Sequence, residues 1–314
     1  MIYCDNYICF QKIGIGCSCI VFRAYHKETR EEVAIKLINS QKFAYLALSP
    51  FHNEIKLLKS LDHPNVVKLV SFSDATVCVN QKNERLHMSY LGLEYLSQGD
   101  LFLYISKSGS FKEDTARFLF KLLIEGLDYL HSHGVYHKDI KPENLMFGKD
   151  FTIKIVDFGF ATQDEITWSR TGTIPYMLPE IFKREEYEAS SADLFAVGVV
   201  LFNMVVQHPP FMSANPTDQL YKLLGSKDHT RFWNTHWKML NDTEYFSEEF
   251  KSLINSMLAF DPFERPSIAE IKESSWYQGS TPSIEEFQEE MCNRRKLISH
   301  NSNLQKASLS TKED

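Results

Sequence analysis

Cysteine pairs with metal-binding spacing are missing from this chain. Its six cysteines include no CxxC pair and no histidine-rich spacing of the kind that binds zinc. We therefore expect reduced thiols, which indicates the cytoplasm, with the nucleus as a further compartment. The first residues, Met1 to Asp5, contain no basic stretch followed by an apolar one, so a secretory signal is not expected.

Long apolar runs and an excess of positive charge are missing as well. The longest apolar run, Leu194–Val206, is too short to span a bilayer and contains Gly198 and Asn203. It therefore predicts a buried core helix and no membrane span. The net charge of −7 disfavours nucleic acid and anionic membranes as partners, and it suits cationic peptides.

The chain is long and apolar enough to build a sizeable core. It has 314 residues, of which 43% are hydrophobic and 24% charged, so it has room for one large two-lobed domain. Alternating apolar and polar side chains predict short strands between residues 6 and 38, and helical spacing predicts a helix over residues 50–60. Beyond Gly99 the pattern becomes mostly helical.

The composition changes after Gly279. The segment Ile284–Ile298 is first acidic and then basic, and it places Phe287 and Met291 on one face of a predicted helix. This helix either packs against the helical half of the chain or serves as a calmodulin-binding or autoinhibitory element. The polar residues from Ser299 onward predict a disordered end.

The most informative stretch is Tyr136–Asn144, with the sequence YHKDIKPEN, followed by Asp157-Phe158-Gly159. Phosphoryl transfer requires metal ions at the phosphates, a carboxylate that faces the attacking hydroxyl, and cations that stabilise the developing charge. An acid, a lysine, an asparagine and a second acid stand here at that spacing. The stretch resembles the catalytic and metal-binding loops of eukaryotic serine/threonine protein kinases, and the resemblance extends from about Tyr7 to Trp276. It is closest to the calcium/calmodulin-dependent and sucrose-non-fermenting-type groups.

The resemblance implies an α+β, two-lobed protein kinase fold. The β-rich N-lobe, with one main helix, would cover about residues 1–95, and the mostly helical C-lobe about residues 96–279. Residues 280–314 would form a C-terminal tail. ATP and Mg²⁺ would be the nucleotide and the metal.

The resemblance also assigns roles in the catalytic loop. Asp139 would be the base that receives or orients the substrate hydroxyl, and Lys141 would neutralise the γ-phosphate. Asn144 and Asp157 would hold Mg²⁺ through oxygen atoms. Structural roles are implied for His137, Phe158, Glu180, Asp193 and Arg265, with Glu180 and Arg265 forming a buried ion pair and Asp193 anchoring the backbone of the catalytic loop.

A glycine pair near the N-terminus resembles the glycine-rich loop of the family, in which backbone N–H groups approach phosphates. Taken alone it would be read as a tight turn, but the strand motif Val33-Ala34-Ile35-Lys36 follows it. Lys36 would reach the phosphates, oriented by Glu54. The residues implied to bind the nucleotide are Ile13, Gly14, Gly16, Ser18, Val21, Ala34, Lys36, Leu93, Glu94, Leu96, Asp100 and Met146. Cys19 replaces the third glycine of the family pattern.

The segment from Asp157 to Glu180 would be the activation segment. Ser169 is the implied phosphorylation site, with Thr171 as the second choice and a plain hydroxyl as the alternative. Lys138 stands where the family usually has arginine, which would weaken the dependence on a loop phosphate because lysine offers only one compact charge. Thr173 would hydrogen-bond near Asp139.

These features together imply an enzyme that phosphorylates serine and threonine in protein substrates and has a signalling role. Asp100 and Glu143 match acidic positions that receive arginine in basophilic relatives, so basic substrates are expected. An upstream activating kinase would be a further partner. A pseudokinase scaffold and a small-molecule phosphotransferase are the alternatives.

Overall fold

The computed structural model describes residues 1–16, 19–39, 45–239 and 246–310. The chain divides into two compact units. Unit 1 comprises Met1–Ser97 and Val156–Ala161, and unit 2 comprises Gln98–Ile155 and Thr162–Asp314. A segment of six residues in the middle of the sequence therefore belongs to the N-terminal unit.

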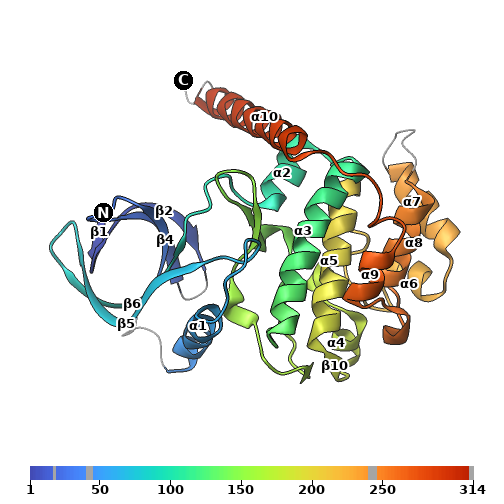
Figure 1. Cartoon of the computed structure of the whole chain (residues 1–314), viewed down its shortest axis with the longest axis horizontal. Coiled ribbons are helices and arrows are strands. Elements are labelled where there is room, and N and C mark those ends of the chain that lie inside the picture. The colour runs from blue at the N-terminus through green and yellow to red at the C-terminus, as the bar shows by residue number, and fades with distance from the viewer. Residues whose placement is uncertain (17–18, 40–44, 240–245, 311–314) are drawn as a thin grey trace. The chain divides into compact units, whose positions relative to one another are not determined.

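Unit 1 is built on an antiparallel β-barrel, drawn in blue to cyan in Figure 1. Its strands are β1 (Ile2–Cys4), β2 (Tyr7–Ile15), β3 (Cys19–His26), β4 (Glu32–Asn39), β5 (Leu69–Asn80) and β6 (Arg85–Glu94). The strand order is β1-β2-β3-β4-β6-β5, and β1 closes the barrel because it also pairs with β5. Alternate residues of β4, among them Val33, Ile35 and Leu37, point into the barrel core, as the period of a strand requires.

A disulfide between Cys4 and Cys78 joins β1 to β5. The two Cα atoms lie 4.4 Å apart, and both side chains are buried. The expectation that all thiols are reduced is therefore wrong for this pair. No sequence pattern indicates this disulfide, because 74 positions separate the two cysteines and only the closure of the barrel brings them together.

The main helix of unit 1 is α1 (Tyr45–Leu58). It begins before the predicted start at residue 50 and contains Pro50. Its C-terminal half buries Phe51, Ile55 and Leu58. A short 3-10 turn, η2 (Phe158–Phe160), packs on this helix, and Asn53 Nδ2 donates a hydrogen bond to the carbonyl of Ala161 at 2.8 Å.

Unit 2 is mostly helical. Its helices are α2 (Leu101–Ser108), α3 (Glu113–Ser132), α4 (Pro179–Lys183), α5 (Ala189–Val206), α6 (Gln219–Gly225), α7 (His229–Met239), α8 (Glu248–Met257), α9 (Ile268–Glu273) and α10 (Ile284–Ser310). Helix α5 is long and apolar enough to cross a membrane, but 72% of it is buried inside the unit. It forms the core against which α3 and α8 pack.

Short strands and 3-10 turns lie between the helices of unit 2. Two small sheets pair β7 (Leu145–Phe147) with β8 (Ile153–Ile155), and β9 (Ile166–Thr167) with β10 (Tyr187–Glu188). The 3-10 turns of this unit are η1 (Pro142–Asn144), η3 (Ile174–Tyr176) and η4 (Pro262–Glu264).

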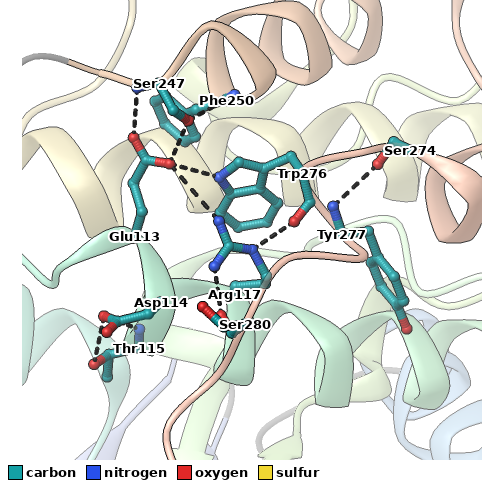
Figure 2. A network of polar contacts seen from close by, with 10 residues as sticks. All are labelled: Glu113, Asp114, Thr115, Arg117, Ser247, Phe250, Ser274, Trp276, Tyr277 and Ser280. Carbon is teal, nitrogen blue, oxygen red and sulfur yellow. Dashed lines mark hydrogen bonds and ion pairs between the residues drawn. The ribbon is translucent and has the colours of Figure 1, made fainter.

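A polar network ties the first turn of α3 to distant parts of unit 2 (Figure 2). The Glu113 carboxylate accepts hydrogen bonds from Ser247, which caps α8, and from Trp276 Nε1 at 2.8 Å. The Arg117 guanidinium donates to the carbonyls of Trp276 and Ser280 and lies over the Trp276 ring. These bonds fix the path of the chain from α9 toward α10.

Helix α10 packs on unit 2, which agrees with the first of the two alternatives for the tail. The Phe287 ring stacks on Phe118 with centroids 4.5 Å apart, and Met291 is fully buried. The expectation of a disordered segment from Ser299 is wrong as far as Ser310, where the helix ends. Once the first turns are fixed by packing, each further residue adds a backbone hydrogen bond without a new nucleation cost.

Candidate active site

The strands of unit 1 bring the implied nucleotide-binding residues into adjacent rows. In the pairing of β2 with β3, Gly14 lies opposite Val21, and in the pairing of β3 with β4, Val21 lies opposite Lys36. Ala34 lies opposite Leu93 between β4 and β6. Val21, Ala34 and Leu93 are each partly buried.

The remaining residues of that set occupy different places. In unit 1, Ile13 is exposed, Leu96 is buried, and the N–H of Gly16 donates to the Cys19 carbonyl at 2.9 Å in the β2–β3 turn. The Glu94 carboxylate accepts from the Lys68 N–H at 2.7 Å. Ser18 lies outside the described residues. Two members of the set belong to unit 2, where they form an isolated β-bridge: Asp100 and Met146.

Lys36 lies between two carboxylates, all within unit 1. Its Nζ is 2.7 Å from Glu54 Oε2 and 3.0 Å from Asp157 Oδ1. Burial disfavours the charge on Lys36, but the Glu54 and Asp157 carboxylates outweigh this effect and raise its pKa above the usual value. The expected pair of Lys36 and Glu54 is thus present, and the ammonium is held in one position as a permanent cation.

Asp157 stands at the start of η2 with a left-handed backbone, φ 63°. This turn buries Phe158 completely while the Asp157 side chain stays half exposed. The segment Asp157–Ala161 is held against α1, so the helix that carries Glu54 also positions Asp157.

The catalytic loop of unit 2 gathers its polar groups around the Asp139 carboxylate. Asp139 accepts hydrogen bonds from Lys141 Nζ at 2.7 Å, Thr173 Oγ1 at 2.8 Å and Asn144 Nδ2 at 3.0 Å. Lys141 Nζ also donates to Thr173 Oγ1 at 2.9 Å. The 3-10 turn η1 that follows Lys141 brings Asn144 back to Asp139. The predicted contact of Thr173 with Asp139 and Lys141 is therefore confirmed.

The backbone before Asp139 is anchored from the core helix. Asp193 on α5 is fully buried and accepts from the N–H groups of His137 and Lys138 at 2.9 and 2.7 Å. His131 Nε2 lies 3.0 Å from the same carboxylate. Lys138 has a positive φ of 65°, which such bonds stabilise. Asp193 thus has the anchoring position expected for it, and His137 is fully buried as a structural residue would be.

The activation segment is ordered on unit 2 by hydrogen bonds around Ser169. Lys138 Nζ donates to Ser169 Oγ, and the Tyr187 hydroxyl donates to the Ser169 carbonyl at 2.6 Å. Thr171 Oγ1 lies 3.4 Å from Ser169 Oγ. Gly172 has φ +111°, and a Cβ there would lie 2.9 Å from the Lys138 carbonyl, so this close approach requires glycine.

The end of the segment is fixed by a buried ion pair. Arg265 Nη2 lies 2.6 Å from Glu180 Oε1, and the side chains are only 5% and 6% exposed. Arg265 also donates to the carbonyls of Ala259 and Phe260. The predicted pair is confirmed. Leu178, where the family prefers alanine, is completely buried.

The oxygen donors present suit Mg²⁺, which binds carboxylate and amide oxygens. Asp157 supplies a carboxylate. Asn144 uses its amide nitrogen to donate to Asp139, so its amide oxygen is the atom that a metal would take. Asn144 belongs to unit 2 and Asp157 to unit 1.

Sequence reasoning missed several partners of the site. Tyr187 binds Ser169, and Asn203 Nδ2 donates to the Tyr176 hydroxyl at 3.0 Å. His131 was not considered as a partner of Asp193. These residues lie on other elements, and no local motif marks them.

Comparison with known proteins agrees with this geometry. The sequence profile described as "Protein kinase domain" matches residues 7–277. The chain is 34% identical over 275 residues to "CBL-interacting protein kinase 11" of Oryza sativa subsp. japonica, covering 85% of this chain and 50% of the relative. It is 34% identical to the "SNF-related serine/threonine-protein kinase" of Homo sapiens, covering 86% and 33%, and 30% identical to "Serine/threonine-protein kinase SIK1" of Mus musculus, covering 87% and 33%. The chain spans about half the length or less of these relatives. It belongs to the protein kinase family.

Proposed function

We propose that the chain is an active serine/threonine protein kinase, which transfers the γ-phosphoryl group of ATP to hydroxyl groups of protein substrates. The observation that carries the proposal is the cluster around Asp139. A carboxylate held by Lys141, Thr173 and Asn144 can orient an incoming hydroxyl and take its proton, while the lysine stabilises charge on the transferred group.

Mg²⁺, when bound, would neutralise phosphate charge through oxygen ligands. Asn144 and Asp157 are the residues of this chain that would hold it. Lys36, kept cationic by its two carboxylate partners, would steady the α- and β-phosphates. None of the groups that the reaction requires is replaced, which argues against a scaffold without catalysis.

The serine/threonine preference is supported by the Lys141-Pro142-Glu143-Asn144 sequence after the catalytic acid. We expect arginine two or three residues before the phosphorylated residue, because Asp100 and Glu143 are acidic and unit 2 carries both. Ser169, next to Lys138, is the site at which an upstream kinase would act. A phosphate there would gain charge-assisted hydrogen bonds.

A peptide array with ATP and Mg²⁺ tests this function. Serine and threonine peptides with arginine at −3 or −2 should be phosphorylated faster than proline-directed or acidic peptides. Matched peptides with alanine at the acceptor, and the variant Asp139→Asn, are the controls. Selection of acidic peptides would contradict the basophilic preference, and phosphorylation of small alcohols alone would favour a small-molecule phosphotransferase.

A further inference from the structure

The C-terminal helix α10 packs against helix α2, as Figure 1 shows. At the C-terminal end of α2, the Arg294 guanidinium donates to Ser108 Oγ at 3.1 Å, to the Gly109 carbonyl at 3.0 Å and to the Ser110 carbonyl at 2.7 Å. Arg294 Nη1 also lies 3.4 Å from the Ser108 carbonyl, which belongs to the last turn of α2 and has no partner within the helix, and a cation at this end is favoured by the helix dipole.

The Arg294 side chain is itself held in place. Its Nε donates to Glu290 Oε1 at 2.8 Å, and Glu290 Oε2 accepts from Thr115 Oγ1 on α3 at 2.7 Å. The guanidinium also lies 4.0 Å from the centre of the Phe111 ring. Arg294 therefore connects α10, the end of α2 and the start of α3 in one network.

At the other end of α2, the neighbouring Arg295 approaches Gly99. Gly99 has φ +85°, and Arg295 Nη1 lies 3.8 Å from the position that a Cβ on Gly99 would take. The next residue, Asp100, caps α2 and accepts from the Leu103 N–H at 2.7 Å. Burial raises the pKa of Asp100.

The short segment before α2 is also fixed from within unit 2. The N–H of Phe147 on β7 donates to the Gly99 carbonyl at 2.8 Å, and the buried Tyr104 hydroxyl donates to the Gln98 carbonyl at 3.0 Å. Helix α2 has eight residues, so a displacement at its C-terminal end is carried to Asp100 over only about 12 Å of rigid helix.

We propose that Arg294 is a positioning residue that sets the place of Asp100 through α2, so that α10 supports nucleotide binding instead of inhibiting the enzyme. The proposal rests on the proposed kinase function and on the nucleotide-binding role that the family resemblance implies for Asp100. The residues of α10 that contact α2, among them Arg294, lie beyond residue 277, where the match to the protein kinase family ends. This coupling is therefore a property of the tail.

Hydrogen exchange of the nucleotide-free full chain tests the structural half of the proposal. In Arg294→Ala, the amides of α2 should exchange faster than in the native chain, and Arg294→Lys should give an intermediate rate because an ammonium replaces only some of the bonds. Lys296→Ala, an exposed cation on the same helix, is the matched control and should change nothing. Unchanged exchange of α2 in Arg294→Ala would overturn the proposal.

Nucleotide affinity and steady-state kinetics test the functional half. Arg294→Ala should raise the Kd and the KM for ATP roughly fivefold, comparable to the loss of one hydrogen bond, with kcat little changed. If Arg294 had only a structural role, the variant would have a lower unfolding temperature but an unchanged Kd and KM for ATP. A higher turnover would show inhibition by α10 and would overturn the proposal, as would an unchanged ATP affinity. If Arg294→Ala does not fold, Glu290→Gln removes its support more mildly and is read in the same way.

The proposed kinase function and the proposed role of Arg294 can fail independently. If the native chain phosphorylates no peptide, the proposed function fails, while the exchange of α2 and the Kd for ATP still decide whether Arg294 controls this helix.

Discussion

Removing the Arg265 guanidinium would leave the Glu180 carboxylate buried without its cation. Glu180 is about 6% exposed, and its Oε2 has no hydrogen-bond partner in the part of the chain that the structure describes. Arg265 Nη2 lies 2.6 Å from Glu180 Oε1, and Arg265 Nη1 lies 3.2 Å from Ser191 Oγ. The variant Arg265→Leu should therefore lose roughly 3–5 kcal/mol of unfolding free energy, the range measured when one partner of a buried pair is deleted.

This loss is large compared with the total stability of a domain, which is about 5–15 kcal/mol. With a urea dependence of about 3 kcal/mol/M, the unfolding midpoint would fall by about 1–2 M. Urea titration followed by tryptophan fluorescence measures it. The variant Lys227→Leu breaks the exposed pair of Lys227 with Glu264 and is the matched control, for which no measurable shift is expected.

A double variant separates the stranded charge from lost packing. Replacing both Glu180 and Arg265 by leucine removes both charges, so it should be less destabilised than the sum of the two single variants. An Arg265→Leu midpoint equal to that of the native chain would refute the reasoning. A double variant as unstable as that sum would also refute it.

Three further changes have defined outcomes. Lys36→Met should lower kcat/KM by about a hundredfold in initial rates measured over a range of ATP, because a fixed cation at the phosphates is lost. Burial, with a smaller contribution from His208, lowers the pKa of His236 to about 4. As the pH is lowered, His236 is therefore protonated in the unfolded chain before it is protonated in the folded chain. The free energy of unfolding should fall by about 3 kcal/mol as the pH is lowered from 6.5 to 4, as measured by calorimetry. Reducing the Cys4–Cys78 disulfide, which spans 74 positions, should lower the unfolding free energy by about 4 kcal/mol in urea titration.

Each of these outcomes has a result that would contradict it. A Lys36→Met enzyme with the native kcat/KM would show that the ammonium does not act on the phosphates. The variant His236→Phe should lose its share of the pH dependence, so the same slope in variant and native chain would exclude His236 as its source. Alkylation of Cys4 and Cys78 without prior reduction would show that the disulfide is absent, whereas the exposed Cys292 should be alkylated in either case.

The catalytic loop could be read from the sequence because its groups are local. Asp139, Lys141 and Asn144 fall within six residues, and a single 3-10 turn brings them together. The pairs of Lys36 with Glu54 and of Glu180 with Arg265 are distant in sequence, and only the resemblance indicated them.

Other features could not be read because they depend on how elements meet. Strand β1 has three residues, too few for a periodic signal, yet it closes the barrel. The bond of Tyr187 to Ser169 depends on the pairing of β9 with β10. Helix α10 continues to Ser310 although its last residues are polar, because its first turns are fixed by packing on α2 and α3.

The most direct test of the account is the rate at which the chain transfers phosphate from ATP to a basic serine peptide, compared between Asp139→Asn and Asp150→Asn. Asp150 is an exposed turn residue whose side chain accepts from the Thr152 N–H, a bond that asparagine preserves. The account predicts a loss of about 10²–10⁴-fold in kcat for Asp139→Asn and the native rate for Asp150→Asn. An undiminished rate in Asp139→Asn would contradict the account.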